Sequence, residues 1–491
     1  MMNAAGYLLA IGEDGATALE CGEERMSYAE LRAAVGRAAA GWRARGLGQG
    51  ERVLVFAPDG IAWAIAYLGA IWAGGVAVGL NSRLFERELS VVLSESEARF
   101  IWCSEGSRAL LERLLSGSAS PPQLVIDTQW SAGLPGFDLV PAVELPDDAP
   151  AIWIYTSGTT GLPKAVMHAQ RTFIASADFA RAILGLGAQD RIYASSKMFF
   201  AYALGNSLMA GLRLGATVIL DPEWPTAERV AEIAERHRPT TLFSVPTLYL
   251  KMLQSEVAPR LVAAGVRHYV SAGETLPAAV RRGWQDATGV APVSGYGASE
   301  TVALVFYCGD DSMRLKPAPR LEYFLRDGAG DGAPQRLWLQ HPSVALGYWR
   351  RPEAERDSFS NGRFSPGDLF RQCDDGYVEF CGRDDDMLKI SEQWVSVLQV
   401  EQALLGASAG SVDSLAAVGF DNAEGLVSIA LFAVAARGQE ARARECIAAG
   451  IEALPKLKRP RLVKWVTELP LTATGKLQRR KLKQQHLENT P

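Results

Sequence analysis

A dense run of hydroxyl side chains, two glycines and one lysine occupies residues 155–164, which read Tyr-Thr-Ser-Gly-Thr-Thr-Gly-Leu-Pro-Lys. Glycines permit tight bends that leave backbone N–H groups facing an anion. Hydroxyl groups and an ammonium group add donors and charge for several phosphate oxygens. An ordinary polar turn is the alternative interpretation, and the spacing is not that of a P-loop. We expect a triphosphate to be held by Thr156, Ser157, Gly158, Thr159, Thr160 and Lys164.

Four further polar clusters are spread along the chain. Residues 294–301 read Ser-Gly-Tyr-Gly-Ala-Ser-Glu-Thr, and a carboxylate such as that of Glu300 beside a triphosphate is a natural Mg²⁺ ligand. Asp368 follows a Ser-Pro-Gly turn, where its carboxylate can take two ribose hydroxyls. Residues 382–385 read Gly-Arg-Asp-Asp, and residues 470–479 read Pro-Leu-Thr-Ala-Thr-Gly-Lys-Leu-Gln-Arg. Each cluster alone is more typical of a turn or of a solvated charged surface.

The composition is that of a globular enzyme with more than one domain. The chain has 491 residues, too many for one core, and its net charge of −5 gives no general attraction to nucleic acid or anionic membranes. The 6 cysteines form no C-x-x-C pair and the 5 histidines form no metal motif, which suits a reduced cytoplasmic protein. The N-terminal residues lack the pattern of a signal peptide.

An uncharged stretch over residues 61–80 has the length of a membrane span. Gly74 and Gly75 interrupt it, and no basic anchor lies at its N-terminal edge. We therefore expect a buried helix that ends near Ala73, followed by a buried strand over residues 76–80.

The elements that must position these clusters alternate between helices and short apolar strands. Helices are expected over 28–46 and 227–236, and strands over 52–57, 100–103, 217–220 and 241–244. This alternation predicts an α/β fold with doubly wound parallel sheets. We expect a β-barrel-like region to follow, with a hairpin around residues 374–376. A small α+β domain follows, with strands over 415–418, 427–434 and 462–466 and a helix over 440–449. The charged residues 382–385 look like a linker, so the expected domains are 1–381 and 386–491.

Together and in this order, the clusters resemble the acyl-adenylate-forming superfamily, which contains acyl-CoA synthetases, adenylation domains and luciferases. The resemblance covers nearly the whole chain. Residues 195–207, Ser-Ser-Lys-Met-Phe-Phe-Ala-Tyr-Ala-Leu-Gly-Asn-Ser, are similar to benzoate and aminobenzoate CoA ligases, although a buried aromatic helix would also explain them. The resemblance implies an enzyme that adenylates a benzoate-like acid with ATP and Mg²⁺ and transfers the acyl group to coenzyme A.

The resemblance also implies a role for each matching residue. Residues 156–160 and Lys164 would hold the phosphates, Ser299 the α-phosphate and Glu300 the Mg²⁺ ion. Adenine would lie against Tyr296, Gly273, Glu274 and Thr275, and the ribose would bind Asp368 and Arg383. Lys476 would bridge the acid and the α-phosphate, which makes Lys476, Glu300 and Lys164 the catalytic set. The linker at 382–385 would be the hinge, with Asp385 as the residue about which a mobile C-terminal domain swings between an adenylating pose and a thioester-forming pose. The acid pocket would be lined by Ala201, Tyr202, Ser271, Gly297, Ala303 and Leu304.

Three departures from the family pattern bear on specificity. Benzoate ligases usually carry a histidine-isoleucine pair where this chain has Ala303 and Leu304, so the space favours a substituted ring over plain benzoate. Glu392 replaces the glycine that the family has in the loop expected to line the pantetheine tunnel, where a glutamate side chain would block the tunnel or change its charge. The stretch before residues 337–339 is shorter than usual, and we expect a trimmed surface loop.

Alternative functions remain at this point. A stand-alone ligase could load an aromatic acid onto the pantetheine of an acyl carrier protein. A degenerate member that binds without turnover is disfavoured by the intact Lys164, Glu300, Asp368 and Lys476. A luciferase-like oxygenase would need oxygen chemistry that the sequence does not reveal. The expected partners are small molecules, with no nucleic acid and no membrane, and the expected state is a monomer or homodimer.

Overall fold

The computed structural model describes residues 1–157, 163–310, 312, 314–326, 333–373, 375–383, 386–390, 393–408, 410–422, 426–470 and 477–486. The chain divides into two compact units, of which the first contains Met1–Tyr323 and Leu339–Phe364 and the second contains Phe324–Trp338 and Ser365–Pro491. The boundary expected at residue 381 is one between parts of the chain that move separately, and this boundary stays a prediction.

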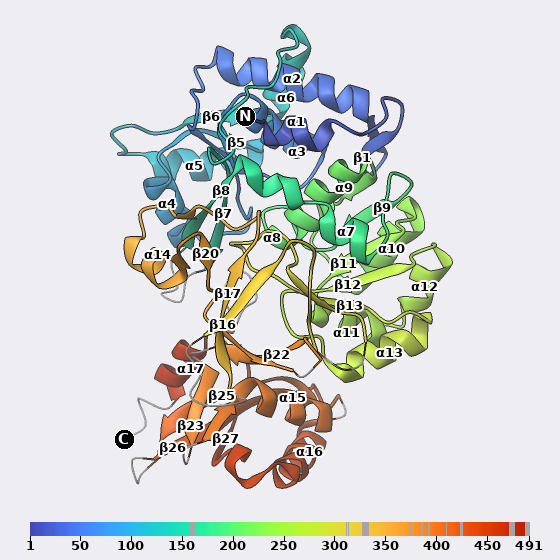
Figure 1. Cartoon of the computed structure of the whole chain (residues 1–491), viewed down its shortest axis with the longest axis vertical. Helices are drawn as coiled ribbons and strands as arrows, with labels where there is room; N and C mark the ends of the chain where they lie inside the picture. The colour runs from blue at the N-terminus through green and yellow to red at the C-terminus, as the bar shows by residue number, and fades with distance from the viewer. Residues whose placement is uncertain are drawn as a thin grey trace. The chain divides into compact units, whose positions relative to one another are not determined.

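Two large sheets with parallel centres form the frame of the first unit (Figure 1). One has the order β18-β8-β7-β4-β3-β5-β6 and is parallel from β7 to β6. Its strands are β3 (Arg52–Phe56), β4 (Val76–Gly79), β5 (Ala98–Cys103), β6 (Gln123–Ile126), β7 (Pro150–Ser157), β8 (Pro163–Ala169) and β18 (Gly347–Tyr348).

The other sheet has the order β15-β14-β13-β12-β11-β9-β10-β1-β2 and is parallel from β13 to β1. Its strands are β1 (Thr17–Cys21), β2 (Glu24–Ser27), β9 (Arg191–Ala194), β10 (Thr217–Leu220), β11 (Thr241–Ser244), β12 (His268–Ser271), β13 (Val293–Tyr296), β14 (Phe306–Cys308) and β15 (Lys316–Pro317). Parallel strands end at one common edge, so the ends of β11, β12 and β13 bring separate sequence clusters together.

Helices cover both faces of these sheets. One core cluster packs on α2 (Tyr28–Ala44), α3 (Ile61–Trp72), α8 (Ala201–Ala203), the π-helix η4 (Leu204–Met209) and α9 (Ala210–Leu214). A second packs on α10 (Ala227–His237), α11 (Pro246–Gln254), α12 (Ala258–Ala263) and α13 (Ala278–Thr288). In β11, Phe243 belongs to the first cluster and Leu242 to the second. The expected doubly wound α/β fold is confirmed, because neighbouring strand residues enter cores on opposite faces.

The remaining helices of the first unit are shorter or more peripheral. They include α1 (Ala4–Leu9), α4 (Glu86–Glu95), α5 (Arg108–Leu115), α6 (Asp127–Gly133), α7 (Asp178–Ile183) and α14 (Pro352–Ser358). The short strands β19 (Phe359–Ser360) and β20 (Arg363–Phe364) form an antiparallel pair.

Local sequence explains how the two central helices begin and end. Ser27 caps α2 by accepting from Glu30 N, while Glu30 Oε2 accepts from Ser27 N. The apolar helix α3 is buried along most of its length, and Gly74 ends it with a φ of +89° before β4 begins. The uncharged stretch is therefore a core helix and a strand, as expected. No helix in the described part of the chain is both long and apolar enough to cross a membrane.

The second unit contains an antiparallel hairpin and a small α+β body. The hairpin joins β21 (Asp368–Gln372) to β22 (Val378–Arg383), and β17 (Gln335–Gln340) pairs with β21. The body has the sheet β25 (Val412–Asp421), β26 (Val427–Ala435) and β27 (Leu462–Trp465), and the hairpin β23 (Met387–Ile390) and β24 (Gln393–Ser396). One face of its sheet packs on α15 (Val397–Ala407) and α16 (Glu440–Ala453), and the other on α17 (Arg479–His486). The hairpin and the C-terminal strands and helix are confirmed.

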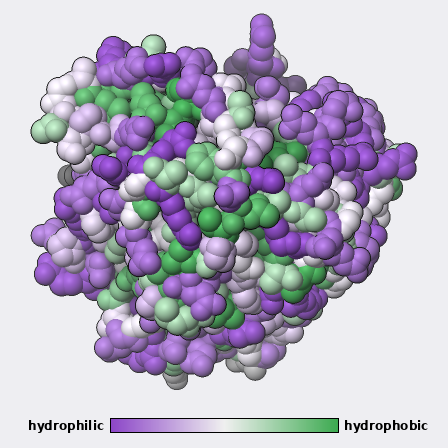
Figure 2. All heavy atoms as spheres, turned by 90° about the horizontal axis from the view of Figure 1, so that it is seen from above, coloured by the Kyte–Doolittle hydropathy of each residue, from purple (hydrophilic) through white to green (hydrophobic). Residues whose placement is uncertain are grey.

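The surface mixes polar and apolar side chains. The face drawn in Figure 2 is hydrophilic over most of its area, with hydrophobic side chains in smaller patches between. Isolated exposed hydrophobic residues include Phe85 and Leu139, as is usual for a folded chain.

Candidate active site

Strands β7 and β8 bring Thr156 and Lys164 to the same end of a hairpin. The two residues are directly paired in the antiparallel register and lie near the two ends of the run at residues 155–164. Gly158, Thr159 and Thr160 lie outside the described residues, so their part in phosphate binding stays a prediction.

Lys164 and Glu300 are brought together as an ion pair. Lys164 Nζ lies 3.7 Å from Glu300 Oε1, and the exposed fractions of the two side chains are 23% and 10%. Partial burial strengthens such a pair because water screens it less. The pair brings one cation and one carboxylate together at the start of β8, and their contact with a triphosphate stays a prediction.

Tyr348 is a third member of this cluster that the sequence interpretation missed. Its hydroxyl donates to Glu300 Oε1 at 2.6 Å, and Lys164 Nζ lies 3.8 Å from its ring centroid. Strand β18 positions it by pairing Tyr348 with Val166 of β8. The only sequence signal is an aromatic pair, Tyr348-Trp349, before two arginines, which does not point to a carboxylate far away in the chain.

The backbone beside Glu300 is anchored at two carbonyl groups. His168 of β8 donates from Nε2 to Ser299 O at 2.8 Å, and Ala345 N donates to Glu300 O at 2.8 Å. Complete burial lowers the pKa of His168 to about 4, so its imidazole is neutral at pH 7. The neutral ring therefore serves as a fixed donor that holds the loop carrying Ser299 and Glu300.

The residues expected around adenine lie at neighbouring strand ends. Tyr296 ends β13 and packs edge-on against Phe306, with ring centroids 6.0 Å apart. Gly273, Glu274 and Thr275 follow β12 and are exposed. Since β12 and β13 are adjacent and parallel, both groups lie along one edge of the sheet. Their contact with adenine stays a prediction.

The expected acid-pocket residues come from three segments. Tyr202 donates from its hydroxyl to Ser244 O at 3.2 Å and to Val270 O at 3.0 Å, which fixes its ring across the ends of β11 and β12. Ala201 and Leu304 belong to the same core cluster. A Cβ on Gly297 would lie 2.6 Å from Ala303 O, so these two residues are neighbours.

Ser271 does not belong to the core cluster that contains its two chain neighbours. Its hydroxyl is buried and has no hydrogen-bond partner among the described residues. Val270 and Ala272, which the sequence interpretation did not include, belong to the core cluster that contains Ala201. The role of Ser271 in the pocket stays a prediction, with Val270 and Ala272 as added candidates.

Asp368 and Arg383 face each other across the hairpin of the second unit. They are paired in register, and Arg383 Nε lies 3.5 Å from Asp368 Oδ1. Gly367, with a φ of +77°, makes the turn that presents Asp368. The pair is consistent with the expected ribose site.

The segment that follows Lys476 is anchored inside the second unit. Arg479 donates to both carboxylate oxygens of Glu401 at 2.7 Å and lies 3.4 Å from Asp386 Oδ1. Burial raises the pKa of Glu401, although Arg479 opposes that shift. Lys476, Asp385 and Glu392 lie outside the described residues, so their predicted roles stay predictions.

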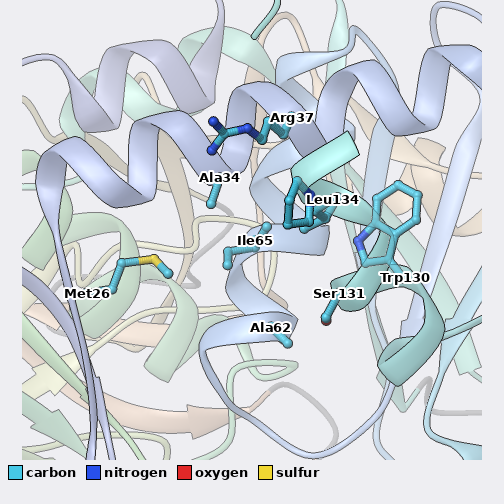
Figure 3. Close-up of a pocket in the computed structure, with 9 residues that line it drawn as sticks. Met26, Ala34, Arg37, Ala62, Ile65, Trp130, Ser131 and Leu134 are labelled. Carbon is cyan, nitrogen blue, oxygen red and sulfur yellow. The ribbon is translucent and has the colours of Figure 1, made fainter. Parts of the chain in front are cut away.

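A separate cavity of about 220 Å³ lies between α2, α3 and α6 (Figure 3). Its walls include Ala34, Ala62, Ile65 and Trp130, and it contains none of the expected site residues. It is not the expected acid pocket.

Comparison with known proteins gives one consistent result. The family model described as AMP-binding enzyme matches residues 11–349. The chain is 37% identical to the 3-hydroxybenzoate–CoA/4-hydroxybenzoate–CoA ligase of Thauera aromatica, over 98% of this chain and 97% of that protein. It is 35% identical to the benzoate–CoA ligase of the same species, over 97% of this chain and 94% of that protein.

Two solved structures share the fold over nearly the whole chain. The anthranilate CoA ligase AuaEII in complex with anthranoyl-AMP has a TM-score of 0.88 and 27% identity, and the match covers 99% of this chain and 97% of that one. The benzoate CoA ligase from Burkholderia xenovorans LB400 has a TM-score of 0.87 and 32% identity, and the match covers 98% of this chain and 100% of that one.

Proposed function

The chain belongs to the AMP-binding enzyme family, and we propose that it activates a hydroxybenzoate for transfer to coenzyme A. The reaction is the ATP-dependent ligation of an aromatic acid to CoA, with AMP and pyrophosphate as products. Loading of a carrier protein is not favoured, because the relatives described above are named as CoA ligases. The cytoplasmic location and the state as monomer or homodimer stay predictions.

The observation that carries this proposal is the ion pair of Lys164 and Glu300, with Tyr348 donating to the same carboxylate oxygen. In the first half-reaction, a carboxylate oxygen of the acid attacks the α-phosphorus of ATP. The bond from that phosphorus to the bridging oxygen breaks, and pyrophosphate leaves with the electron pair. Lys164 would neutralise charge on the departing phosphates.

The described residues fit a Mg²⁺ ion held mainly by nucleotide. No group of three or more His, Cys, Asp or Glu side chains in the described part of the chain could form a protein-only metal site. Mg²⁺ in nucleotide enzymes commonly takes one or two carboxylates, and Glu300 would supply one. When bound, the ion would neutralise charge on the phosphate oxygens.

The second half-reaction passes the acyl group to a thiol. The thiol of CoA gives up its proton to solvent, and its sulfur attacks the acyl carbon. The bond from that carbon to the AMP oxygen breaks, and AMP leaves with the electron pair. Asp368 and Arg383 would hold the ribose through both steps, and Lys476 would act only in adenylation. Asp385 would be the pivot between the adenylating pose and the thioester-forming pose of the C-terminal domain.

A hydroxybenzoate is the proposed acid because of Ala303 and Leu304. The resemblance to benzoate ligases implies that those enzymes usually carry histidine and isoleucine at these two positions. Alanine is smaller than histidine, so Ala303 would leave space beside the ring. The relative that ligates 3-hydroxybenzoate and 4-hydroxybenzoate, at 37% identity, supports the same assignment.

The test is a pyrophosphate-release screen with benzoate, hydroxybenzoates, aminobenzoates, cinnamate and a short fatty acid. Each acid is assayed without thiol, with CoA and with a phosphopantetheinylated carrier protein. A hydroxybenzoate should give the highest kcat/KM, and CoA should accelerate turnover. A preference for the carrier, or for plain benzoate, would contradict the proposal.

A further inference from the structure

The loop between β13 and β14 contains a strained residue two positions after Glu300. Val302 has a φ of +57°, in the left-handed region where a β-branched side chain is a marked outlier. Val302 is only 4% exposed, so the packing around it holds the backbone in this conformation. Thr301 Oγ1 accepts from Ala298 N at 3.0 Å, and Ala303 N donates to Thr301 O at 2.5 Å. The strained residue therefore lies within a turn that is closed by these two hydrogen bonds.

Three glycines press against three consecutive residues of this turn. A Cβ on Gly205 would overlap the carbonyl oxygen of Val302. A Cβ on Gly297 would lie 2.6 Å from Ala303 O, and one on Gly295 would lie 2.5 Å from Leu304 Cδ1. At Gly205 and Gly297 the obstructing atom is backbone, which cannot rotate away. Any side chain at Gly205 would force the turn itself to shift.

Gly205 connects this turn to the acid-pocket segment. It lies in η4, which continues directly from α8 with Ala201 and Tyr202. π-helical turns such as η4 are rare and often occur at functional sites. The loop between β13 and β14 is also anchored before Val302, by the hydrogen bonds from His168 to Ser299 O and from Ala345 N to Glu300 O.

We propose that Val302 and Gly205 are positioning residues, whose contact fixes the Glu300 carboxylate and Ala303 relative to the Ala201–Tyr202 wall of the acid pocket. This inference rests on the proposed function of Glu300 and of that pocket. Strained backbone persists only where surrounding structure imposes it, and it is concentrated at active sites. Through this contact, the arrangement of the aryl wall and that of the metal-binding carboxylate depend on each other.

The first test is Val302→Gly, which relieves the unfavourable φ and also removes a buried side chain. These two effects on stability oppose each other, so the Tm should stay near that of wild type. The loosened turn should lower kcat/KM for the best hydroxybenzoate on the order of tenfold to a hundredfold. It should also raise the Mg²⁺ concentration that gives half-maximal adenylation.

The matched control is Arg238→Gly. Arg238 has a φ of +48° at the C-terminus of α10, so it carries the same kind of strain outside this loop. The control should keep wild-type kcat/KM and the wild-type Mg²⁺ requirement.

A second pair of variants crowds the same helical segment in two directions. Gly205→Ala pushes against the Val302 carbonyl, whereas Gly211→Ala in α9 meets a Val218 methyl group, 2.5 Å from the added Cβ. Both should lower the Tm. Only Gly205→Ala should raise the KM for the aryl acid and the Mg²⁺ requirement.

Wild-type activity is measured first, by pyrophosphate release. A wild type that releases no pyrophosphate with any aryl acid overturns the proposed function and this inference with it. An active wild type, together with a Val302→Gly variant of normal kcat/KM and normal Mg²⁺ dependence, overturns the inference alone.

Discussion

Glu300 receives both of its neighbouring donors on one carboxylate oxygen. Tyr348 donates to Oε1 at 2.6 Å, and Lys164 Nζ lies 3.7 Å from the same atom. These contacts hold one carboxylate oxygen in place, and the binding of a divalent cation by this carboxylate stays a prediction.

Residue types predicted Lys164, Glu300, Asp368 and Arg383, and the structure pairs the first two and the last two. Such residues can be found from the sequence because each lies in a short motif whose residue types indicate its chemistry. Tyr348 and Val302 lie in no such motif. The hydrogen bond of Tyr348 joins segments far apart in sequence, and the φ of Val302 is imposed by tertiary packing that no local pattern encodes.

Ala303 should set tolerance for ring substituents. Ala303→His fills the space beside the substituted ring, and overpacking of this kind costs on the order of 1–3 kcal/mol, or roughly ten- to two-hundredfold in specificity. Plain benzoate should be spared. The measurement is kcat/KM for benzoate and for the best hydroxybenzoate in both proteins. An unchanged ratio would show that Ala303 does not line the pocket.

His168 should make the fold sensitive to acid. Burial lowers its folded pKa to about 4, while the unfolded value is about 6.5, so only the unfolded chain gains a proton between these pH values. The free energy of unfolding therefore falls as the pH drops, by about 2 kcal/mol between pH 7 and 5 from this group.

Denaturant titrations of wild type and His168→Gln at pH 7 and 5 measure this contribution. The variant should lose less stability on acidification, by about the same 2 kcal/mol. Buried His341, whose pKa is also lowered to about 4, stays in place and keeps its own contribution. Equal losses in the two proteins would contradict the assignment.

At the scale of elements, the loop between β9 and α8 is held by a buried lysine. Lys197 Nζ donates to the carbonyl oxygens of Asp221, at 2.6 Å, and Glu223. Asp59 Oδ2 accepts from Met198 N at 3.1 Å, and burial raises the pKa of Asp59 to about 7, against the effect of Lys197. These contacts fix the loop that leads directly to Ala201 and Tyr202.

Lys197→Met should destabilise the protein and weaken binding of the acid. It leaves the buried carbonyl group of Asp221 and the partly buried one of Glu223 without this donor, and it removes the cation near Asp59. The loss in the free energy of unfolding should be on the order of 3 kcal/mol. The KM for the acid should rise, and the KM for ATP should change little.

Glu20→Gln is the control for Lys197→Met. Glu20 pairs with Arg191 at the opposite end of β9, with 2.5 Å between Oε2 and Nη2. This variant should lose stability without altering the KM for the acid. Equal changes in the two KM values of Lys197→Met would mean that the network only stabilises the fold.

Helices and strands were predictable where their signals are local. The capping box at Ser27 and Glu30 marks the start of α2, and Gly74 separates α3 from β4. The π-helical geometry of η4 has no such local signal, and the close approach of Gly205 to the Val302 turn joins segments far apart in the sequence.

For the whole molecule, the two half-reactions should depend on different residues of the second unit. Lys476→Ala should slow adenylation by on the order of 3–4 kcal/mol, because it removes one charge from the place where two anions meet. ATP binding and thiolysis of supplied acyl-adenylate should be largely intact. Rapid-quench assays of the separate half-reactions measure this, and equal losses in the two would contradict the role of Lys476.

The two half-reactions should also separate at the predicted hinge. Proline fixes φ and prevents a large backbone rotation, so Asp385→Pro should hold the chain in one pose. Adenylation, followed by pyrophosphate release, should survive, while thioester formation with CoA should fall. Asp385→Ala is the matched control, because it removes the carboxylate and keeps the rotational freedom of φ, and it should retain thioester formation. Unimpaired overall turnover of Asp385→Pro would place the pivot at another residue.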